Sequence, residues 1–472
     1  MSENFDFEME VVDTEAATDS SSDVGQQSSS TEKEKNRRQT ETPSAKQWPP
    51  IPKDWEMVKG SQVYDANPTR YDADGEVDYI EMDALKTDLP DPKYVGRRDP
   101  SEYSGQMFTS GDTLFAQITP CTENGKAALV PEIRSEVGIG STEFIVLSPD
   151  RAEITPEYLY YLSKSHPVHD YAVSRMRGST GRQRVPVDVF RKELQFPLPP
   201  LPEQRKIASV LYTVDQTIQK TEEIIEQAKR VKRGLMQRFF REGFREHSGY
   251  TESHHRNCLH QHPNTWEVLP AEEVMEVSRG SHPRPKSDPS LWGGGIPIIK
   301  IGDRNRGDRR FVTETTDTVT EKGSESSKRV PEGTLIVSNA GTCGVARIAG
   351  MEACVHDHWL ILRNYEDRLD TRYLFYYINY NQDFLATLAS GSTVDDLNTD
   401  DFRLFDIAVP PLGEQREIAA TLDGLHDQVM QSKGTVSQLK RLKKGLMQDL
   451  LTGEVRTADK AIEVLEEVQA HG

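Results

Sequence analysis

The chain has 472 residues, too many for one ordinary hydrophobic core, so we expect two or more domains. Its 76 acidic and 57 basic residues give a formal net charge of −19, which argues at first sight against nucleic acid, whose phosphates favour basic surfaces. The sequence contains no run of about 18 apolar residues, the length needed to cross a membrane. Its four scattered cysteines, without a Cys-x-x-Cys, indicate a reduced cytoplasm rather than a disulfide framework.

The N-terminal segment 1–47 is polar and serine-rich, with 11 acidic and 5 basic residues. Such a composition cannot bury enough apolar surface to fold, so we predict a disordered acidic tail. Basic residues are bunched elsewhere: segment 228–241 holds six cations and no anion. Acid spread over all other surfaces suits a protein kept soluble in strong salt, which leads to the hypothesis of a halophilic, haloarchaeal host.

Residues 48–200 form the first predicted module, with β-rich runs at 113–118 and 143–148 and an aromatic helical stretch at 156–165. Its loop 174–185 is basic and polar. Arg and Gln pair with base edges and hydroxyls suit phosphates, although basic loops are also ordinary solvated surface. The candidate DNA-binding residues of this module are Lys126, Arg175, Arg177, Ser179, Thr180, Arg182, Gln183 and Arg184.

Residues 201–243 follow with apolar side chains at alternating steps of four and three, the seam of a coiled coil. Prolines at 199, 200 and 202 set its start and Gly243 its end. We predict one long helix, with residues 244–262 as a linker behind it. Its predicted seam residues are Ile207, Leu211, Val214, Ile218, Ile225, Leu235 and Phe239.

Residues 263–410 form the second predicted module, with strands at 334–339 and 358–363 and a helix at 371–380. Its candidate DNA-binding residues lie in two basic loops and in a Gly-Ser-Thr loop: Arg279, Ser281, His282, Arg284, Lys286, Lys300, Arg304, Asn305, Arg306, Ser392 and Thr393. Four aspartates directly after the Gly-Ser-Thr make that last loop a poor phosphate binder, so its role is doubtful.

Residues 411–453 repeat the first long helix. "LPEQRKIASVL" from Leu201 and "LGEQREIAATL" from Leu412 agree at seven of eleven positions, 211 residues apart, and "KRGLMQ" and "KKGLMQ" match at the same offset. The predicted seam here comprises Ile418, Leu422, Leu425, Val429, Val436, Leu439, Leu446 and Leu450, before a C-terminal tail at 454–472. A unit of roughly 211 residues is therefore duplicated.

An isolated helix with such a seam leaves an apolar stripe in water, so each long helix needs a partner. We predict that the two helices pair as an antiparallel intramolecular coiled coil, which relates the duplicated units by a pseudo-twofold axis. The fold class is then α+β, two mixed α/β modules separated by two paired helices. Packing of each helix on its own module, or a coiled-coil dimer between chains, stays open as an alternative.

Catalytic signatures are nearly absent from the sequence. "ENGKAAL" lacks the earlier glycine and the Ser/Thr of a P-loop, and no Asn-Pro-Pro-aromatic tetrapeptide of an amino-methyltransferase is present. Cys354, His356 and His358 could suggest a metal, but no second ligand pair stands near them in the sequence. We therefore predict neither a metal site nor a catalytic site, and interpret the chain as a recognition protein.

The repeated motifs resemble one family over about residues 48–453. "PLPPLPEQRKIASVL", "KRGLMQRFF", "VPPLGEQREIAATL" and "KKGLMQDLLTGEV" are similar to the helices of type I restriction–modification specificity subunits. "ITPCTENGKAALV" at 118–130 and "GGIPIIKIGD" at 294–303 resemble the target-recognition domains of that family. The acidic tail, the strongly negative charge and the aspartate-rich second Gly-Ser-Thr loop depart from its pattern.

The resemblance implies a DNA-binding protein in which each module reads one half of a bipartite, asymmetric double-stranded site. The paired helices would set the spacing and dock two methyltransferase subunits that bind S-adenosylmethionine and methylate adenine. Restriction subunits would supply ATP- and Mg²⁺-dependent cleavage, so this chain would bind no cofactor itself. Two other classes stay open: a coiled-coil scaffold that binds no DNA, and a self-sufficient methyltransferase or nuclease.

Overall fold

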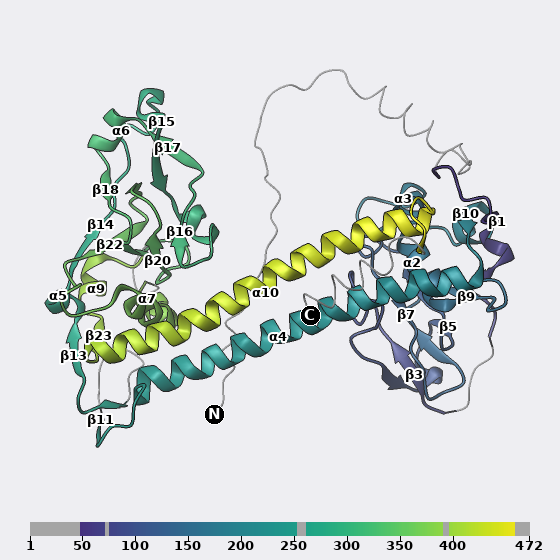
Figure 1. Cartoon of the computed structure of the whole chain (residues 1–472), viewed down its shortest axis with the longest axis horizontal. Coiled ribbons are helices and arrows are strands. Elements are labelled where there is room, and N and C mark those ends of the chain that lie inside the picture. Colours follow the sequence, from purple (N-terminus) through teal and green to yellow (C-terminus); the bar gives the residue numbers. More distant parts are fainter. Residues whose placement is uncertain (1–47, 71–74, 253–260, 390–395, 458–472) are drawn as a thin grey trace. The chain divides into compact units, whose positions relative to one another are not determined.

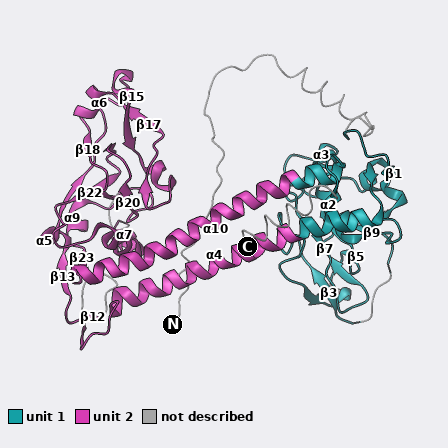
Figure 2. Cartoon of the chain, in the orientation of Figure 1, with its two compact units in different colours: residues 1–212, 446–462 teal, residues 213–445, 463–472 magenta. Residues whose placement is uncertain are grey.

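The computed structural model describes residues 48–70, 75–252, 261–389 and 396–457. The chain divides into two compact units, which Figure 2 colours separately. Unit 1 comprises residues 1–212 and 446–462, and unit 2 comprises residues 213–445 and 463–472. The predicted N-terminal tail, most of the C-terminal tail, Ser392 and Thr393 lie outside the described residues.

Unit 1 contains the first module, built on two four-stranded sheets and one strand pair. The antiparallel sheet has the order β2-β9-β6-β7, formed by Tyr64–Ala66, Phe144–Pro149, Thr113–Ala116 and Ala127–Leu129. The mixed sheet has the order β4-β3-β8-β5, formed by Gly96–Arg98, Val77–Ile80, Gly138–Gly140 and Gln106–Phe108. Strands β1 (Glu56–Lys59) and β10 (Gln195–Leu198) pair at the two ends of the module, which brings its first and last segments together.

Unit 2 contains the second module, which repeats this strand order with one strand added. Its first sheet is β14-β22-β19-β20-β16, formed by Glu276–Arg279, Trp359–Arg363, Leu335–Ser338, Ala346–Ala349 and Phe311–Val312. Its second sheet is β17-β15-β21-β18, formed by Asp317–Val319, Trp292–Ile299, Ala353–Val355 and Lys328–Val330. Strands β13 (Glu267–Pro270) and β23 (Asp406–Val409) close the module as β1 and β10 close the first. The two modules thus share a topology although their sequences between the anchors differ.

Short helices pack on the sheets of each module. Thr155 caps α2 by accepting a hydrogen bond from the Tyr158 amide, and Asp370 caps α7 in the corresponding place. Both helices bury a run of tyrosines against the module core, as their aromatic sequences predict. The shorter helices are α2 (Pro156–Lys164), α3 (His166–Ser174), α5 (Ala271–Val274), α6 (Glu321–Glu325), α7 (Thr371–Tyr380), α8 (Gln382–Ala389) and α9 (Thr399–Arg403). Single turns of 3-10 or π type occur at Gly60–Gln62, Pro100–Glu102, Val189–Glu193, Pro289–Leu291 and Ile301–Asn305.

The two long helices form where the repeated motif predicts them. Helix α4 spans Leu201–Glu242 and α10 spans Leu412–Thr452 (Figure 1). Gly243 and Gly453 follow them with φ angles of +86° and +75°, the left-handed conformation that ends a helix and that glycine adopts without strain. The segment predicted as a linker, 244–262, also holds strand β11 (Tyr250–Glu252), which pairs with β12 (Gln261–Pro263).

The predicted seam of both helices is largely withdrawn from water. Thirteen of its fifteen residues are buried, and the other two, Leu235 and Leu425, are half-buried. Within unit 2, three side-chain contacts join the two helices: Asp215 to Lys443, Glu222 to Lys440, and Lys232 to His426. Position numbers rise along α4 as they fall along α10, so these segments run in opposite directions.

The repeated Glu-Gln pair at the start of each long helix attaches that helix to its own module. Gln204 is fully buried; its amide nitrogen donates to the carbonyl oxygens of Glu153 and Pro199, and its oxygen accepts from the Thr155 amide. Gln415 makes the corresponding three bonds in the second module, to Arg368, Pro410 and Asp370. These side-chain bonds fix the chain where the module ends and the helix begins.

The glutamate of the same motif joins three segments. The Trp55 indole donates to Glu203 at 3.0 Å, and the Trp266 indole donates to Glu414 at 3.1 Å. In unit 1, Arg456 from the end of α10 also donates to Glu203, at 2.7 Å. In unit 2, the Phe244 amide after the end of α4 donates to Glu414 at 2.8 Å. The motif therefore occurs twice because in each module the glutamate joins the same three segments: the start of the module, the start of one long helix and the segment after the end of the other.

Candidate nucleic-acid interface

The basic loop of the first module is a short hairpin held against the end of β6. Arg177 and Arg184 exchange backbone hydrogen bonds of 2.9 and 2.8 Å, and the amide of Thr119 donates to the carbonyl of Gln183. Gly178 and Gly181 take positive φ angles of +133° and +81°, which allow the chain to reverse within a few residues. Ser179, Thr180 and Arg182 lie exposed at or beside the tip of this hairpin.

The five predicted cations of the first module divide by what their side chains already contact. Arg175 forms an ion pair of 2.8 Å with Glu193, and this carboxylate raises the pKa of the guanidinium. Arg184 donates to both carboxylate oxygens of Glu143 and holds the pKa of that carboxyl below its usual range. Each of these two arginines therefore directs part of its guanidinium to a carboxylate of its own module.

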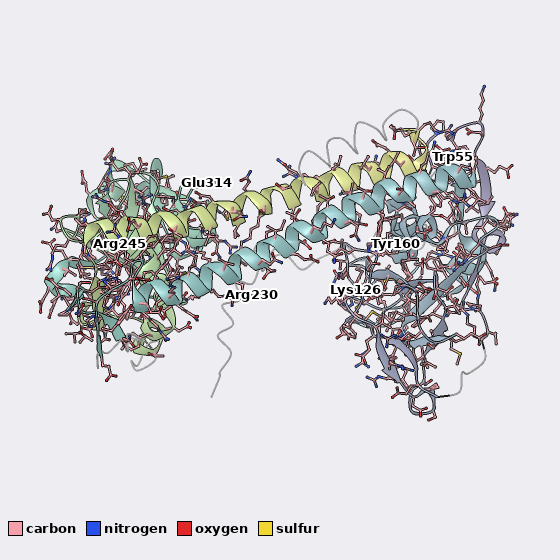
Figure 3. All side chains as sticks on the ribbon, turned by 60° about the horizontal axis from the view of Figure 1, so that its bottom comes forward. Trp55, Lys126, Tyr160, Arg230, Arg245 and Glu314 are labelled. Carbon is pink, nitrogen blue, oxygen red and sulfur yellow. The ribbon has the colours of Figure 1, made fainter. Side chains whose placement is uncertain are left out.

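Arg177 and Arg182 remain available at the surface. Both side chains are exposed, and among the described residues neither forms an ion pair. Lys126, labelled in Figure 3, lies in the turn between β6 and β7, half-buried, with its ammonium 3.3 Å from the Met82 carbonyl oxygen. The hairpin therefore presents two open guanidiniums, two hydroxyls and the Gln183 side chain, which is half-buried.

The first basic loop of the second module begins at the end of β14. Arg279 donates to the Asp357 carbonyl oxygen at 2.6 Å, and the Ser281 hydroxyl donates to the Ser326 carbonyl oxygen. His282 is buried beside the carboxylate of Asp357, so it does not offer a side chain to the surface. Arg284 and Lys286 are exposed, and the Arg284 guanidinium lies 3.9 Å from the Asp357 carboxylate.

The second basic loop of this module is the turn that follows β15. Lys300 forms an ion pair of 2.7 Å with Asp317 and lies over the Trp292 ring. Arg306 contacts the buried Asp303 at 3.2 Å and the exposed Glu314 at 3.9 Å, and Figure 3 labels Glu314. Arg304 is half-buried and Asn305 exposed. Asn305 and the outer edges of Arg304 and Arg306 are thus the accessible polar groups of this turn.

Arg310, at the end of that loop, was not among the predicted site residues, yet it attaches the module to α10. Its guanidinium lies 2.8 Å from Asp308 and from Asp423, and 2.5 Å from Asp427. The Tyr376 hydroxyl also donates to Asp423 at 2.8 Å. The sequence "DRNRGDRR" gives no signal to separate this structural arginine from its exposed neighbours, because its two partners on α10, Asp423 and Asp427, lie more than 100 residues away.

The structure also brings together a cluster that the sequence did not reveal. His282, His356 and Asp357 lie side by side, although 74 positions separate the first two. In the sequence, Cys354, His356 and His358 have no second ligand pair near them. His282, the partner that the fold supplies, stands among the candidate DNA-binding residues instead.

Comparison with known proteins identifies the family. The family model described as "Type I restriction modification DNA specificity domain" matches twice, over residues 52–230 and 263–441. A protein of Methanocaldococcus jannaschii named as the specificity subunit of the type I restriction enzyme MjaX is 26% identical over 90% of this chain and 97% of its own. The MjaVIII specificity subunit of the same organism is 24% identical over 68% of this chain and 75% of its own.

A solved structure gives the same fold. One chain of a type I R-M system, solved to describe complex assembly and conformational transition, covers 86% of this chain and 100% of its own with a TM-score of 0.54 and 24% identity. The chain belongs to the type I restriction–modification DNA specificity family, as its repeated motifs predict, and its function is DNA sequence specificity. Among the described residues, no helix is long and apolar enough to cross a membrane.

Proposed function

We propose that each module reads one half of a bipartite, asymmetric site on double-stranded DNA. The observation that carries this proposal is the same strand order built twice, each time with exposed cations on loops that differ between the modules. Arginine pairs bidentately with guanine edges, whereas lysine and hydroxyl groups position phosphates. Two modules with one scaffold and unlike loops are suited to two unlike half-sites.

The hairpin of the first module supplies the sharpest test of DNA contact. Replacing both Arg177 and Arg182 by alanine should weaken DNA binding. The plot of the logarithm of the association constant against the logarithm of salt concentration should become less steep by about 2, because two cations that can neutralise phosphates are lost. Gel shifts of the purified complex over a salt series measure that slope. Lys53→Ala, an exposed cation outside the loops, is the control. An unchanged slope in the double variant would place the DNA elsewhere, or support a scaffold that binds none.

We also propose that α4 and α10 pair as an antiparallel intramolecular coiled coil with pseudo-twofold symmetry. Two polar contacts within unit 2 support this: Asp215 with Lys443, and His426 with Lys232. His426 and Lys443 stand 211 positions after Asp215 and Lys232, the offset of the sequence repeat. The second contact is therefore the first one with the roles of the two helices exchanged, as a twofold axis requires.

Such a helix pair would act as a spacer and as the docking surface for two methyltransferase subunits. Ile224 and Val231 support docking, since they are 44% and 52% exposed on the outer side of α4, two helical turns apart. Ile224→Asp with Val231→Asp should abolish co-purification of the methyltransferase subunit while the chain stays folded. Arg230→Asp, an exposed charge reversal on the same helix, controls for altered charge.

The chemistry of the system would belong to the partner subunits. We propose that this chain carries no catalytic centre, that S-adenosylmethionine binds to the methyltransferase subunits, and that restriction subunits bind ATP and Mg²⁺. Exchange of residues 52–200 for another family member's module should change one half-site of the methylated sequence and leave the other. Sequencing of modified adenines in the host measures both halves at once, and a change in both would contradict independent modules.

A further inference from the structure

A compact group of metal-ligand side chains lies in the second module, apart from the exposed basic residues. His282 follows β14, while His356 and Asp357 occupy the turn between β21 and β22. One potential ligand atom from each residue lies within 4.8 Å of the others. His282 Nδ1 is 3.0 Å from one Asp357 oxygen, and His356 Nδ1 is 2.7 Å from the other. The single carboxylate thus lies between two imidazoles.

Within the described part of the chain, two atoms of this group lack a partner with hydrogen-bond geometry despite their short contacts. His282 Nδ1 and Asp357 Oδ1 are both buried, and among the described residues neither has a hydrogen-bond partner of acceptable geometry. His356 Nδ1 also lies 3.4 Å from the His358 amide, a contact in which this nitrogen would accept. With its proton on the other ring nitrogen, His356 would face the carboxylate oxygen at 2.7 Å with a lone pair, an arrangement that a cation between them would stabilise.

Both histidines are buried. The two rings stack with centroids 4.6 Å apart, and His282 is 4% exposed. A neutral imidazole carries one N–H, so each ring can present a lone pair to an ion when its proton is on the other nitrogen.

The backbone around the group is fixed by strand pairing. The Gly280 amide donates to the Trp359 carbonyl oxygen at 2.8 Å, and the Ser281 amide donates to Val355 at 2.9 Å. A Cβ on Gly280 would lie 2.3 Å from the His356 carbonyl oxygen, so only glycine permits this approach of the two segments. The backbone hydrogen bonds of the sheet thus fix the positions of the two segments that carry the ligand residues.

We propose that His282, His356 and Asp357 bind a divalent transition-metal ion, with zinc as the best match. Two imidazoles and one carboxylate are a ligand set that zinc accepts, with a fourth position left for water. Ligands 2.0–2.1 Å from a tetrahedral zinc are about 3.3 Å apart, so the ligand atoms would move closer together and the stacked rings would turn until a nitrogen of each faces the ion. The ion would tie the loop that carries Arg284 and Lys286 to the turn between β21 and β22.

Two arginines near the group reduce the affinity expected for a metal ion but do not block the ligand atoms. Arg284 reaches within 3.9 Å of the Asp357 carboxylate, and Arg279 is turned away toward Asp396 and the Asp357 backbone. A bound divalent ion would compete with Arg284 for the carboxylate and release this guanidinium to the surface. Metal binding would then increase the positive charge that the loop presents.

The test is metal binding by the full-length chain without an affinity tag, measured in the absence of DNA. After treatment with a chelator, the chain should take up about one Zn²⁺ in calorimetric titration, and Co²⁺ should give the visible absorption of a tetrahedral site. Zinc at a hundredfold excess over its Kd should raise the unfolding temperature by about 5 °C, reversibly on chelation. Wild-type chain that binds no metal would overturn the proposal, whatever the variants do.

Variants localise the ion. His356→Gln and Asp357→Asn should each lose the cobalt absorption and the thermal shift, whereas His166→Gln, a 77% exposed histidine of α3, should retain both. His254, His255, Cys258 and His260 are further potential ligands in the sequence, so a variant that replaces all four is a second control. Loss of binding in that control, with binding retained in Asp357→Asn, would also overturn the proposal. Because DNA is absent, the result is independent of the proposed half-site reading.

Discussion

Two buried glutamines, Gln204 and Gln415, explain at the residue scale why the chain repeats its helix start. Each amide satisfies three backbone groups where a proline-rich segment cannot supply its own partners. A buried backbone group left without a partner costs about 1–3 kcal/mol, so no apolar residue of similar size can replace these glutamines. The neighbouring glutamates add the third segment, which brings the far end of the other long helix into the same joint.

Gln204→Leu should therefore destabilise unit 1 by about 3 kcal/mol or more, since three buried backbone groups lose their partner. Hydrogen exchange of the Thr155–Leu159 amides, followed by mass spectrometry, should show faster opening there, with unit 2 unchanged. Gln227→Leu, on an exposed position of the same helix, serves as the control and should stay within about 0.5 kcal/mol of wild type. Equal protection in Gln204→Leu and wild type would show that the amide is dispensable.

The long helices carry charge between them, and Lys443 and Lys232, which each contact the other helix, differ in their surroundings. Lys443 lies 2.5 Å from Asp215, whose side chain is fully buried. Lys232 instead faces the neutral His426 and the Tyr376 ring, and burial, followed by the charge of Arg310, lowers its pKa to about 8. Removing Lys443 leaves the buried carboxylate of Asp215 without its ion-pair partner. Removing Lys232 takes away only an ammonium group whose burial costs free energy.

Lys443→Met should accordingly destabilise unit 2 by about 3–5 kcal/mol, the range for breaking a buried ion pair from one side. Lys232→Met should be neutral or stabilising, because methionine fills the same volume without a charge to desolvate. Urea unfolding of the two variants, measured side by side, gives the comparison directly. Asp215→Asn in the Lys443→Met background should restore part of the loss. Equal effects of the two lysine substitutions would contradict the assigned difference.

His426 makes the stability of unit 2 depend on pH. Burial, followed by the charge of Lys232, lowers its pKa to about 4, against about 6.5 in an unfolded chain. Between these values the unfolded state binds more protons, so the free energy of unfolding falls as pH drops from 6.5 toward 4. His426→Gln should reduce that slope in urea unfolding at a series of pH values, while the exposed His166→Gln should leave it unchanged. The slope will not vanish, because burial also lowers the pKa of His356.

Local sequence patterns predict much of this fold. The boundaries of α4 and α10 fall within a residue of those that the coiled-coil period predicts, and strands β6, β9, β19 and β22 lie in the predicted β-rich runs. Contacts between distant positions were not predictable, since no local pattern reports them. Arg175 and Arg177 look alike in the sequence, yet of the two only Arg175 forms an ion pair with Glu193 among the described residues. For the same reason the sequence places His282 among the candidate DNA-binding residues: no pattern around His282 indicates that it lies beside His356.

At the scale of the whole molecule, the proposed spacer predicts how the DNA site responds to helix length. Four residues inserted after Ile224 and after Thr435, equivalent positions of the repeat, lengthen each helix by about 6 Å, roughly one further turn. The gap between the methylated half-sites should then grow by about one to two base pairs at 3.4 Å per step, depending on the tilt of the helices to the DNA. Insertion of two residues instead rotates the seam by about 200° and should abolish folding or assembly, which separates a length effect from simple damage. Sequencing of modified adenines in the host gives the gap; an active four-residue variant with the original gap would mean that the helices do not set the spacing.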